Sequence, residues 1–247
     1  MAEREGLFII CIGAPGGGKT WLIRDQFIPI NSRNFILPAS GFDNSFDSVG
    51  RRLKPAAHYI QEAQKRVQIG KKKTRYAVKK WYMPGLNTFA GNVICDIGTI
   101  EDDKDYYEFF RSISTNRGGI VAAGLVIDDM KNYILATGKL PGTIREMFSE
   151  RRKRELDIFM ATHSFQDVNA DLIQYKPSFF IFNTELPPYG AVLDKIRLSK
   201  ELLQTIEYIN WVAQNKDAHY FEPFHPTNTT LNIKPEQREY WDEFSNK

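Results

Sequence analysis

Eight consecutive residues near the start of the chain have the composition and spacing of a phosphate-binding loop. Segment 13–20 reads Gly-Ala-Pro-Gly-Gly-Gly-Lys-Thr, which is a glycine, four further residues and then Gly-Lys-Thr. Glycines allow positive φ angles and let backbone N–H groups approach an anion closely. The pattern therefore predicts a nucleoside triphosphate site. Its expected ligand residues are Gly13, Ala14, Pro15, Gly16, Gly17, Gly18, Lys19 and Thr20.

The last two residues of this loop carry side chains suited to a magnesium-bound triphosphate. We expect Lys19 to neutralise the β- and γ-phosphates and Thr20 to offer its hydroxyl to Mg²⁺. A helix that begins near Lys19 adds the positive end of its dipole. The expected cofactors are ATP and Mg²⁺, and the motif does not distinguish ATP from GTP.

A second segment places two carboxylates at the end of an apolar run. Leu125-Val126-Ile127 precedes Asp128 and Asp129. One carboxylate beside a phosphate loop can hold Mg²⁺ through water, and a second can orient the attacking water. We assign Asp128 to the metal and Asp129 to the water; an acidic turn at the end of a strand is the alternative. Hydrolysis usually uses Glu at the second position, and Asp is one methylene shorter.

A third apolar segment, 157–162, is followed by His163 and Ser164. A polar side chain at the end of a strand next to the phosphate loop can contact the γ-phosphate and respond to its presence. We assign this sensor role to His163, with Ser164 as an alternative. A histidine with only a structural role is the competing interpretation.

Two basic segments can bind polyanions. In a ring-shaped ATPase, an arginine of one subunit can stabilise charge at its neighbour's γ-phosphate, and segment 151–154, Arg-Arg-Lys-Arg, offers candidates. A solvated helix end is the alternative. The basic run at 65–80 has Tyr76 and Trp81 close by, a combination that can track a nucleic-acid backbone and stack on bases. A solvated surface hairpin is the alternative there.

Apolar runs and helical periodicity alternate along the chain. Strands are expected at 7–12, 34–38, 93–97, 120–127, 157–162 and 178–183, and around 218–221. Helices are expected at 20–27, 51–69, from about 101 through Phe110, at 141–154 and at 192–214, with an irregular tail and a short final helix from 223. Alternating strands and helices predict a mostly parallel α/β sheet sandwiched between helices.

Composition is ordinary for a globular protein, with 247 residues, 42% hydrophobic and 26% charged, and a net charge of +3. We expect one P-loop domain over 1–247, with an insertion at about 42–92 and a C-terminal extension at about 223–247. Cys11 and Cys95 each lie in an apolar run, which indicates buried reduced thiols of a cytoplasmic protein. The longest apolar run is too short to span a bilayer, so no direct membrane insertion is expected.

Taken together, these segments resemble the HerA–FtsK superfamily of DNA-pumping P-loop ATPases. That lineage includes the genome-packaging ATPases of tailless, often membrane-containing viruses and the Zot-like proteins of filamentous phages. The stretch 149–163, with its arginines, apolar strand and Ala161-Thr162-His163, is similar to the family pattern of an Arg, a spacer, a strand and Ala-Thr-Gln. The match covers roughly 7–30 and 120–185; two departures are His163 for Gln and Asp129 for Glu.

The resemblance implies a RecA-like fold and a homo-oligomeric ring, a hexamer or a pentamer, that threads DNA through its centre. Arg152 falls where the family has its trans-acting arginine, and His163 where it has its sensor. Lacking large extra domains, the chain looks like a minimal viral packaging motor. The implied partners are viral DNA and capsid vertex proteins, in the host cytoplasm and at the packaging vertex of the virion.

Three alternatives remain open at this stage. A Zot-like assembly or export ATPase shares the same site chemistry but usually carries a membrane anchor. A P-loop kinase for a small molecule needs an arginine-rich lid, which 151–154 could imitate. A nucleotide-dependent scaffold at a virion vertex binds ATP without hydrolysing it.

Overall fold

The structure is a computed structural model that describes residues 6–63, 75–86, 88–97, 109–115 and 119–247. Its main sheet is eight-stranded. The strands are β1 (Phe8–Ile12), β2 (Asn34–Leu37), β3 (Arg51–Leu53), β6 (Asn92–Cys95), β7 (Ala123–Ile127), β8 (Leu156–Thr162), β9 (Ser178–Ile181) and β10 (Glu222–Phe224). Two further strands, β4 (Ala56–Ala63) and β5 (Arg75–Tyr82), form a separate antiparallel hairpin.

The described helices are short apart from one. The α-helices are α1 (Lys19–Leu22), α3 (Gly142–Ser149), α4 (Gly190–Asp194), α5 (Ser199–Asn215) and α6 (Trp241–Ser245), and residues 109–113 are also helical. Helix α1 continues as the π-helix η1 (Ile23–Phe27) and the 3-10 turn η2 (Ile28–Ile30). Other 3-10 segments are η4 (Met130–Asn132), η5 (Phe165–Asp167), η6 (Ala170–Tyr175), η7 (Thr229–Leu231) and η8 (Pro235–Gln237).

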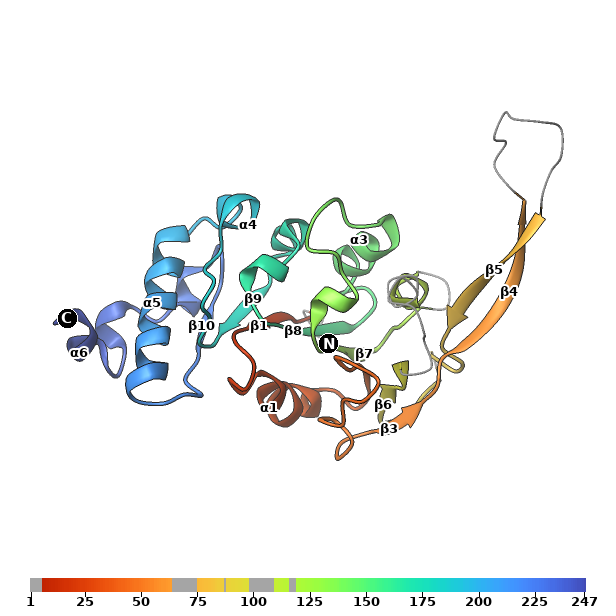
Figure 1. Ribbon diagram of the computed structural model, residues 1–247, viewed down its shortest axis with the longest axis horizontal. Coiled ribbons are helices and arrows are strands. Elements are labelled where there is room, and N and C mark those ends of the chain that lie inside the picture. The colour runs from red at the N-terminus through yellow and green to blue at the C-terminus, as the bar shows by residue number, and fades with distance from the viewer. Residues whose placement is uncertain (1–5, 64–74, 87, 98–108, 116–118) are drawn as a thin grey trace.

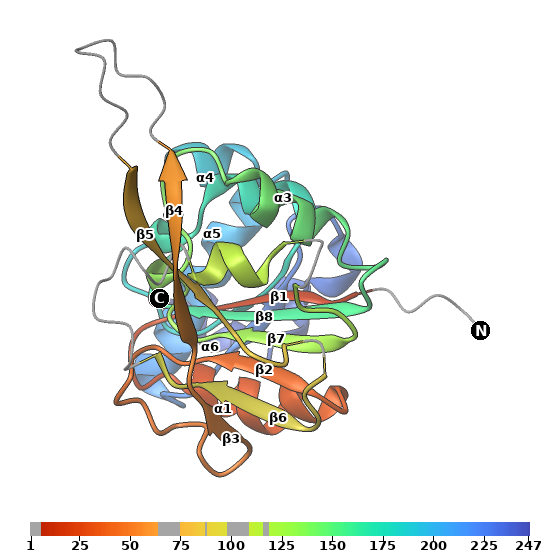
Figure 2. The ribbon, with the colours of Figure 1, turned by 90° about the vertical axis from the view of Figure 1, so that its right-hand side faces the viewer.

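The main sheet runs in the order β10-β9-β1-β8-β7-β2-β6-β3. Every pairing is parallel except that of β10 with β9. The predicted fold class, a mostly parallel α/β sheet between helices, is therefore confirmed. Figures 1 and 2 show α1 covering one face of the sheet and α3 the other, with α5 beside the β10 edge.

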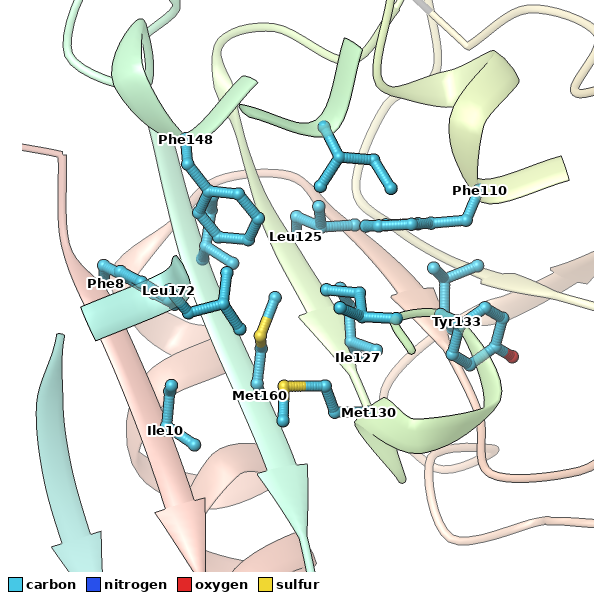
Figure 3. Close-up of a cluster of buried hydrophobic side chains, with 14 of the residues drawn as sticks. Phe8, Ile10, Phe110, Leu125, Ile127, Met130, Tyr133, Phe148, Met160 and Leu172 are labelled. Atoms are coloured by element: carbon cyan, nitrogen blue, oxygen red, sulfur yellow. The ribbon is translucent and has the colours of Figure 1, made fainter. Parts of the chain in front are cut away.

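Both faces of the sheet are buried, which explains the continuous apolar runs. In β1, Phe8, Ile10 and Ile12 pack into one hydrophobic cluster, whereas Ile9 and Cys11 pack into another on the opposite face. Figure 3 shows the first cluster, where side chains from β1, β7, β8 and the helices above the sheet meet. Cys11 and Cys95 are buried and free, as expected. The centre of the sheet is packed on both faces, so its strands hold the loops at their carboxyl ends in fixed positions.

One predicted element has the wrong type. The segment 51–69 was expected to be a helix, but its described part forms β3 and β4. It contains helix-favouring Ala, Gln and Glu residues, yet β4 pairs with β5 over their whole length, from Ala56 opposite Tyr82 to Ala63 opposite Arg75. Cross-strand pairing overrides the local propensity here. Figure 2 shows this hairpin projecting from the body of the molecule.

Several boundaries also differ from the sequence expectations. Helix α3 ends at Ser149 rather than 154, because a turn follows in which Glu155 has a φ of 51°. The expected helix 192–214 is two helices, α4 and α5. The strand expected around 218–221 lies at 222–224 and is antiparallel to β9. The expected start of a helix at 101–105 and most of the basic residues of 65–80 lie outside the described residues.

Candidate nucleotide-binding site

The phosphate loop joins β1 to α1, in the strand–loop–helix context that the motif requires. Strand β8 and the segment after β9 hold it, since the Gly13 N–H donates to Thr162 O at 3.2 Å and the Ala14 N–H donates to Asn183 O at 2.7 Å. A Cβ atom on Gly13 would lie 2.5 Å from the Phe182 Cβ, so no larger residue fits there. Gly16 and Gly18 have φ angles of 77° and 99°, which favour glycine.

Lys19 lies across this loop and is almost fully buried. Its Nζ donates to the carbonyl oxygens of Gly13 and Ala14 at 2.6 and 2.8 Å. Burial lowers the pKa of Lys19 from its ordinary value, and the negative charge of Asp128 opposes that shift. The ammonium group is thus held over the loop by carbonyl oxygens, in reach of an anion bound to the same loop.

Thr20 and Asp128, the two residues assigned to Mg²⁺ from the sequence, meet beside the loop. The Thr20 hydroxyl donates to Asp128 Oδ2 at 3.2 Å. Burial of the Asp128 carboxyl raises its pKa to about 6, the negative charge of Asp43 adds to the shift, and the Thr20 hydrogen bond opposes it. A desolvated carboxylate near a second negative charge favours a nearby cation.

Asp43 is a member of this site that sequence reasoning missed. Its carboxylate accepts hydrogen bonds from the N–H groups of Ala39 and Ser45, at 3.2 and 2.9 Å, and so orders the loop after β2. Sequence alone gave no motif for this loop. Only the pairing of β2 with β7 brings the loop to Asp128.

Asp129 and His163 approach each other at the ends of neighbouring strands. His163 Nε2 lies 3.8 Å from Asp129 Oδ2, and the Lys131 Nζ lies 3.5 Å from the same oxygen. The other carboxylate oxygen of Asp129 is buried and has no hydrogen-bond partner, and neither has Nδ1 of His163. Unpaired polar atoms in this position are available to a ligand or to water.

Ser164, the alternative sensor, is already engaged within its own loop. Its hydroxyl and its N–H both contact Asp167 Oδ2 at 3.2 Å, and the Thr162 hydroxyl donates to the same oxygen at 3.1 Å. These bonds fix the turn after β8. His163 is therefore the better placed of the two to contact a ligand.

The basic segment 151–154 lies at the opposite edge of the sheet. It precedes β8, whereas the phosphate loop follows the carboxyl end of β1, which runs parallel to β8. Arg151 donates to the carbonyl oxygens of Gly6, Phe148 and Tyr175, and buried Arg154 donates to those of Ser114 and Thr115. Arg152 is exposed. Arg152 is thus separated from the other predicted site residues of its own chain.

The described residues can supply two oxygen ligands to a magnesium ion, and not all six. Mg²⁺ is commonly held by one or two protein oxygens, with water and phosphate oxygens completing six ligands. The Thr20 hydroxyl and the Asp128 carboxylate supply that pair. Within the part of the chain that the structure describes, no group of three or more His, Cys, Asp or Glu side chains could hold a metal.

The fold is similar to solved structures of the genome packaging NTPase B204 from Sulfolobus turreted icosahedral virus 2. The complex with AMPPCP aligns with a TM-score of 0.58 and 14% identity over 93% of this chain and 96% of that chain. The complex with sulfate aligns with a TM-score of 0.58 and 13% identity over 94% and 96%. The N-terminal domain of zonular occludens toxin from Neisseria meningitidis aligns at a TM-score of 0.35 with 12% identity over 73% and 79%, too low to support an argument.

No protein-family model and no curated protein matches the sequence. The structural likeness confirms, at the level of the fold, the resemblance to viral packaging ATPases, and the chain has the fold of a P-loop NTPase. The structure brings together the phosphate loop, Asp128, Asp129 and His163 at the carboxyl ends of β1, β7 and β8. Among the described residues, no helix is both long and apolar enough to cross a bilayer.

Proposed function

We propose that this chain is an ATP-driven DNA translocase that packages a viral genome into a preformed capsid. The observation that carries the proposal is a phosphate loop with two acids and a polar residue on adjacent strands, in a fold that matches a genome packaging NTPase over 93% of the chain. On this proposal the chain belongs to the HerA–FtsK superfamily.

In the proposed reaction, different residues bind the phosphates, hold the metal ion and activate the water. The loop 13–18 and Lys19 bind the phosphates, and Thr20 and Asp128 hold Mg²⁺, which neutralises charge on the transferring phosphoryl group. Asp129 orients the attacking water and accepts its proton. His163, 3.8 Å from Asp129, contacts the γ-phosphate and links its presence to the position of that carboxylate.

Arg152 completes the site of a neighbouring subunit rather than its own. It is exposed and precedes β8, on the edge of the sheet opposite the phosphate loop. This placement supports a homo-oligomeric ring, a hexamer or a pentamer, with nucleotide at subunit boundaries. The partners are viral DNA and capsid vertex proteins, in the host cytoplasm and at the packaging vertex.

The same geometry weighs against a small-molecule kinase. A kinase lid must close over the phosphates of its own chain, yet 151–154 lies at the other edge of the sheet and Arg151 and Arg154 are bound to backbone carbonyls. The described geometry does not favour the kinase or the export ATPase over the translocase.

Triplex displacement tests the proposed function. The purified protein is incubated with duplex DNA that carries a fluorescent third strand, with ATP and Mg²⁺. A translocase releases the third strand when ATP is supplied and does not release it with a non-hydrolysable analogue. ATP hydrolysis without ATP-dependent release would instead favour an export ATPase, and tight ATP binding without hydrolysis would favour a scaffold.

A further inference from the structure

The loop 216–221, which joins α5 to β10 (Figure 1), comes close to the phosphate loop at Gly18. A Cβ atom placed on Gly18 would lie 3.7 Å from His219 Nδ1 and 4.0 Å from His219 Cβ. Gly18 immediately precedes Lys19, so the imidazole lies beside the turn that begins α1. His219 is nevertheless exposed. A planar ring is thus open to solvent directly next to the phosphate cradle.

Two sets of contacts hold His219 in this place. On one side, the ring of Phe221 packs on that of Phe182 with centroids 5.0 Å apart, and Phe182 also lines Gly13 and Gly18 of the phosphate loop. On the other, the His219 N–H donates to Asp217 Oδ1 at 2.9 Å within a tight turn. The backbone that carries His219 is therefore tied to the support of the phosphate loop itself.

The strand order gives a bound nucleotide a direction across this loop. The carboxylates and His163 that suit the γ-phosphate follow β7 and β8, on one side of β1. Strands β9 and β10 lie on the other side of β1, and His219 precedes β10. A nucleotide whose γ-phosphate lies at Asp128 and Asp129 has its ribose and base at the far end of the triphosphate, and His219 lies on the side of β1 away from these carboxylates.

We propose that His219 forms the base-binding part of the nucleotide site, with its imidazole stacked against the nucleobase of the bound triphosphate. This inference rests on the proposed binding of nucleotide by the phosphate loop. Ring stacking is tolerant of base identity because every base has a π-face. His219 therefore strengthens the binding of nucleoside triphosphates over other polyphosphates without selecting strongly between ATP and GTP.

The test compares a ligand that has a base with one that has none. Binding of ATP and of inorganic triphosphate, both with Mg²⁺, is measured by calorimetry for the wild type, His219→Ala and His219→Phe. His219→Ala is expected to weaken ATP and GTP binding by about tenfold, in line with the loss of one stacking contact, and to leave inorganic triphosphate unchanged. His219→Phe retains a ring and is expected to restore most of the affinity for ATP.

Gln214→Ala, at an exposed position near the end of α5, is the matched control and leaves both ligands unaffected. Unchanged ATP affinity in His219→Ala would overturn the inference, as would an equal loss for ATP and inorganic triphosphate. If the wild type binds neither ligand, the nucleotide site itself fails. The two results are distinct, because a wild type that binds and hydrolyses ATP leaves the proposed function standing whatever His219 does.

Discussion

Asp129 has a left-handed backbone conformation, with a φ of 54° and a ψ of 69°. Among residues with a side chain, Asn and Asp tolerate this region best, and for others it costs roughly 1–2 kcal/mol. This conformation gives a physical reason for Asp at a position where hydrolases usually have Glu. The backbone turn itself brings the shorter carboxylate toward His163.

Two substitutions of Asp129 separate the effect of its negative charge from the effect of its left-handed backbone conformation. Asp129→Asn keeps the left-handed preference and removes the base, so ATP binding is expected to persist while hydrolysis falls by about 10²–10⁴. Asp129→Glu keeps the charge but strains the turn, so it is expected to lower stability by roughly 1 kcal/mol and not to raise hydrolysis. Single-turnover hydrolysis and thermal denaturation measure both. A Glu variant that is as stable as wild type and faster would refute this explanation.

Asp128 makes the stability of the folded protein depend on pH. Its pKa is raised to about 6 in the folded protein from 3.8, chiefly by burial, so the ionised carboxyl disfavours the folded state. As pH rises, the Asp128 carboxyl loses its proton at a lower pH in the unfolded chain than in the folded protein. The free energy of unfolding therefore falls between about pH 4 and 6, and the loss is complete above that range. A functional carboxylate here lowers the stability of the ligand-free protein.

Asp128→Asn is accordingly expected to stabilise the protein while abolishing magnesium-dependent hydrolysis. Measured with EDTA and no nucleotide, the gain is roughly 1–3 kcal/mol at about pH 8, seen as a higher Tm. At about pH 5 the wild-type carboxyl is largely protonated, so the difference shrinks. A variant that melts at or below the wild-type temperature at the higher pH would show that burial does not penalise this charge.

At the scale of elements, the β4–β5 hairpin stands apart from the main sheet. It projects from the body of the molecule, and β5 places Lys79 opposite Tyr59 and Lys80 opposite His58. A two-stranded ribbon can enter the major groove of DNA, and lysines contribute contacts to phosphates. On the proposed function, we assign DNA contact to this hairpin.

Reversing the charge of this ribbon tests that assignment. Lys79→Glu with Lys80→Glu is expected to weaken DNA binding at least about tenfold and to reduce its salt dependence, because phosphate contacts are lost. Basal ATP hydrolysis should stay near the wild-type rate. Lys200→Glu with Lys234→Glu makes the same charge change at exposed positions elsewhere and serves as control. Equal losses in both pairs would indicate a general charge effect instead.

The sequence predicted the elements that carry their own local pattern. The glycine loop, the central strands β1, β7 and β8 and the acids after β7 follow from short-range spacing, and the structure contains each of them, with shifts of up to three residues at the strand ends. The strand β4 was missed because its residues favour a helix until β5 pairs with them, although a surface hairpin was the alternative interpretation of the basic run at 65–80. Asp43 and His219 could not be found in the same way, since long-range strand order alone brings them to the loop.

At the scale of the whole molecule, the position of Arg152 agrees with the proposed action of this residue on a neighbouring subunit. Strand β8 has seven residues, and at about 3.3 Å per residue it separates the two edges of the sheet by roughly 20 Å. Arg152 lies before this strand and His163 after it. Arg152 at that distance does not reach the phosphate loop of its own chain, so its proposed catalytic role needs a neighbouring subunit.

Mixing two inactive variants tests this arrangement. Lys19→Ala lacks a working phosphate loop but retains Arg152, whereas Arg152→Ala retains the loop and is expected to bind ATP without turning it over. In a mixed ring with equal amounts of each, about one quarter of the boundaries pair an intact loop with an intact arginine, so hydrolysis should reappear. Hydrolysis by Arg152→Ala alone, or its absence from every mixture, would argue against a shared site.

The most direct measurement is the steady-state rate of ATP hydrolysis with Mg²⁺, with and without duplex DNA, for the wild type and Lys19→Ala. A DNA motor built on this phosphate loop should hydrolyse ATP, should do so faster when duplex DNA is added, and should lose both activities when Lys19 is replaced. Hydrolysis that is indifferent to DNA, or that survives the loss of the Lys19 ammonium group, would contradict an ATP-driven translocase.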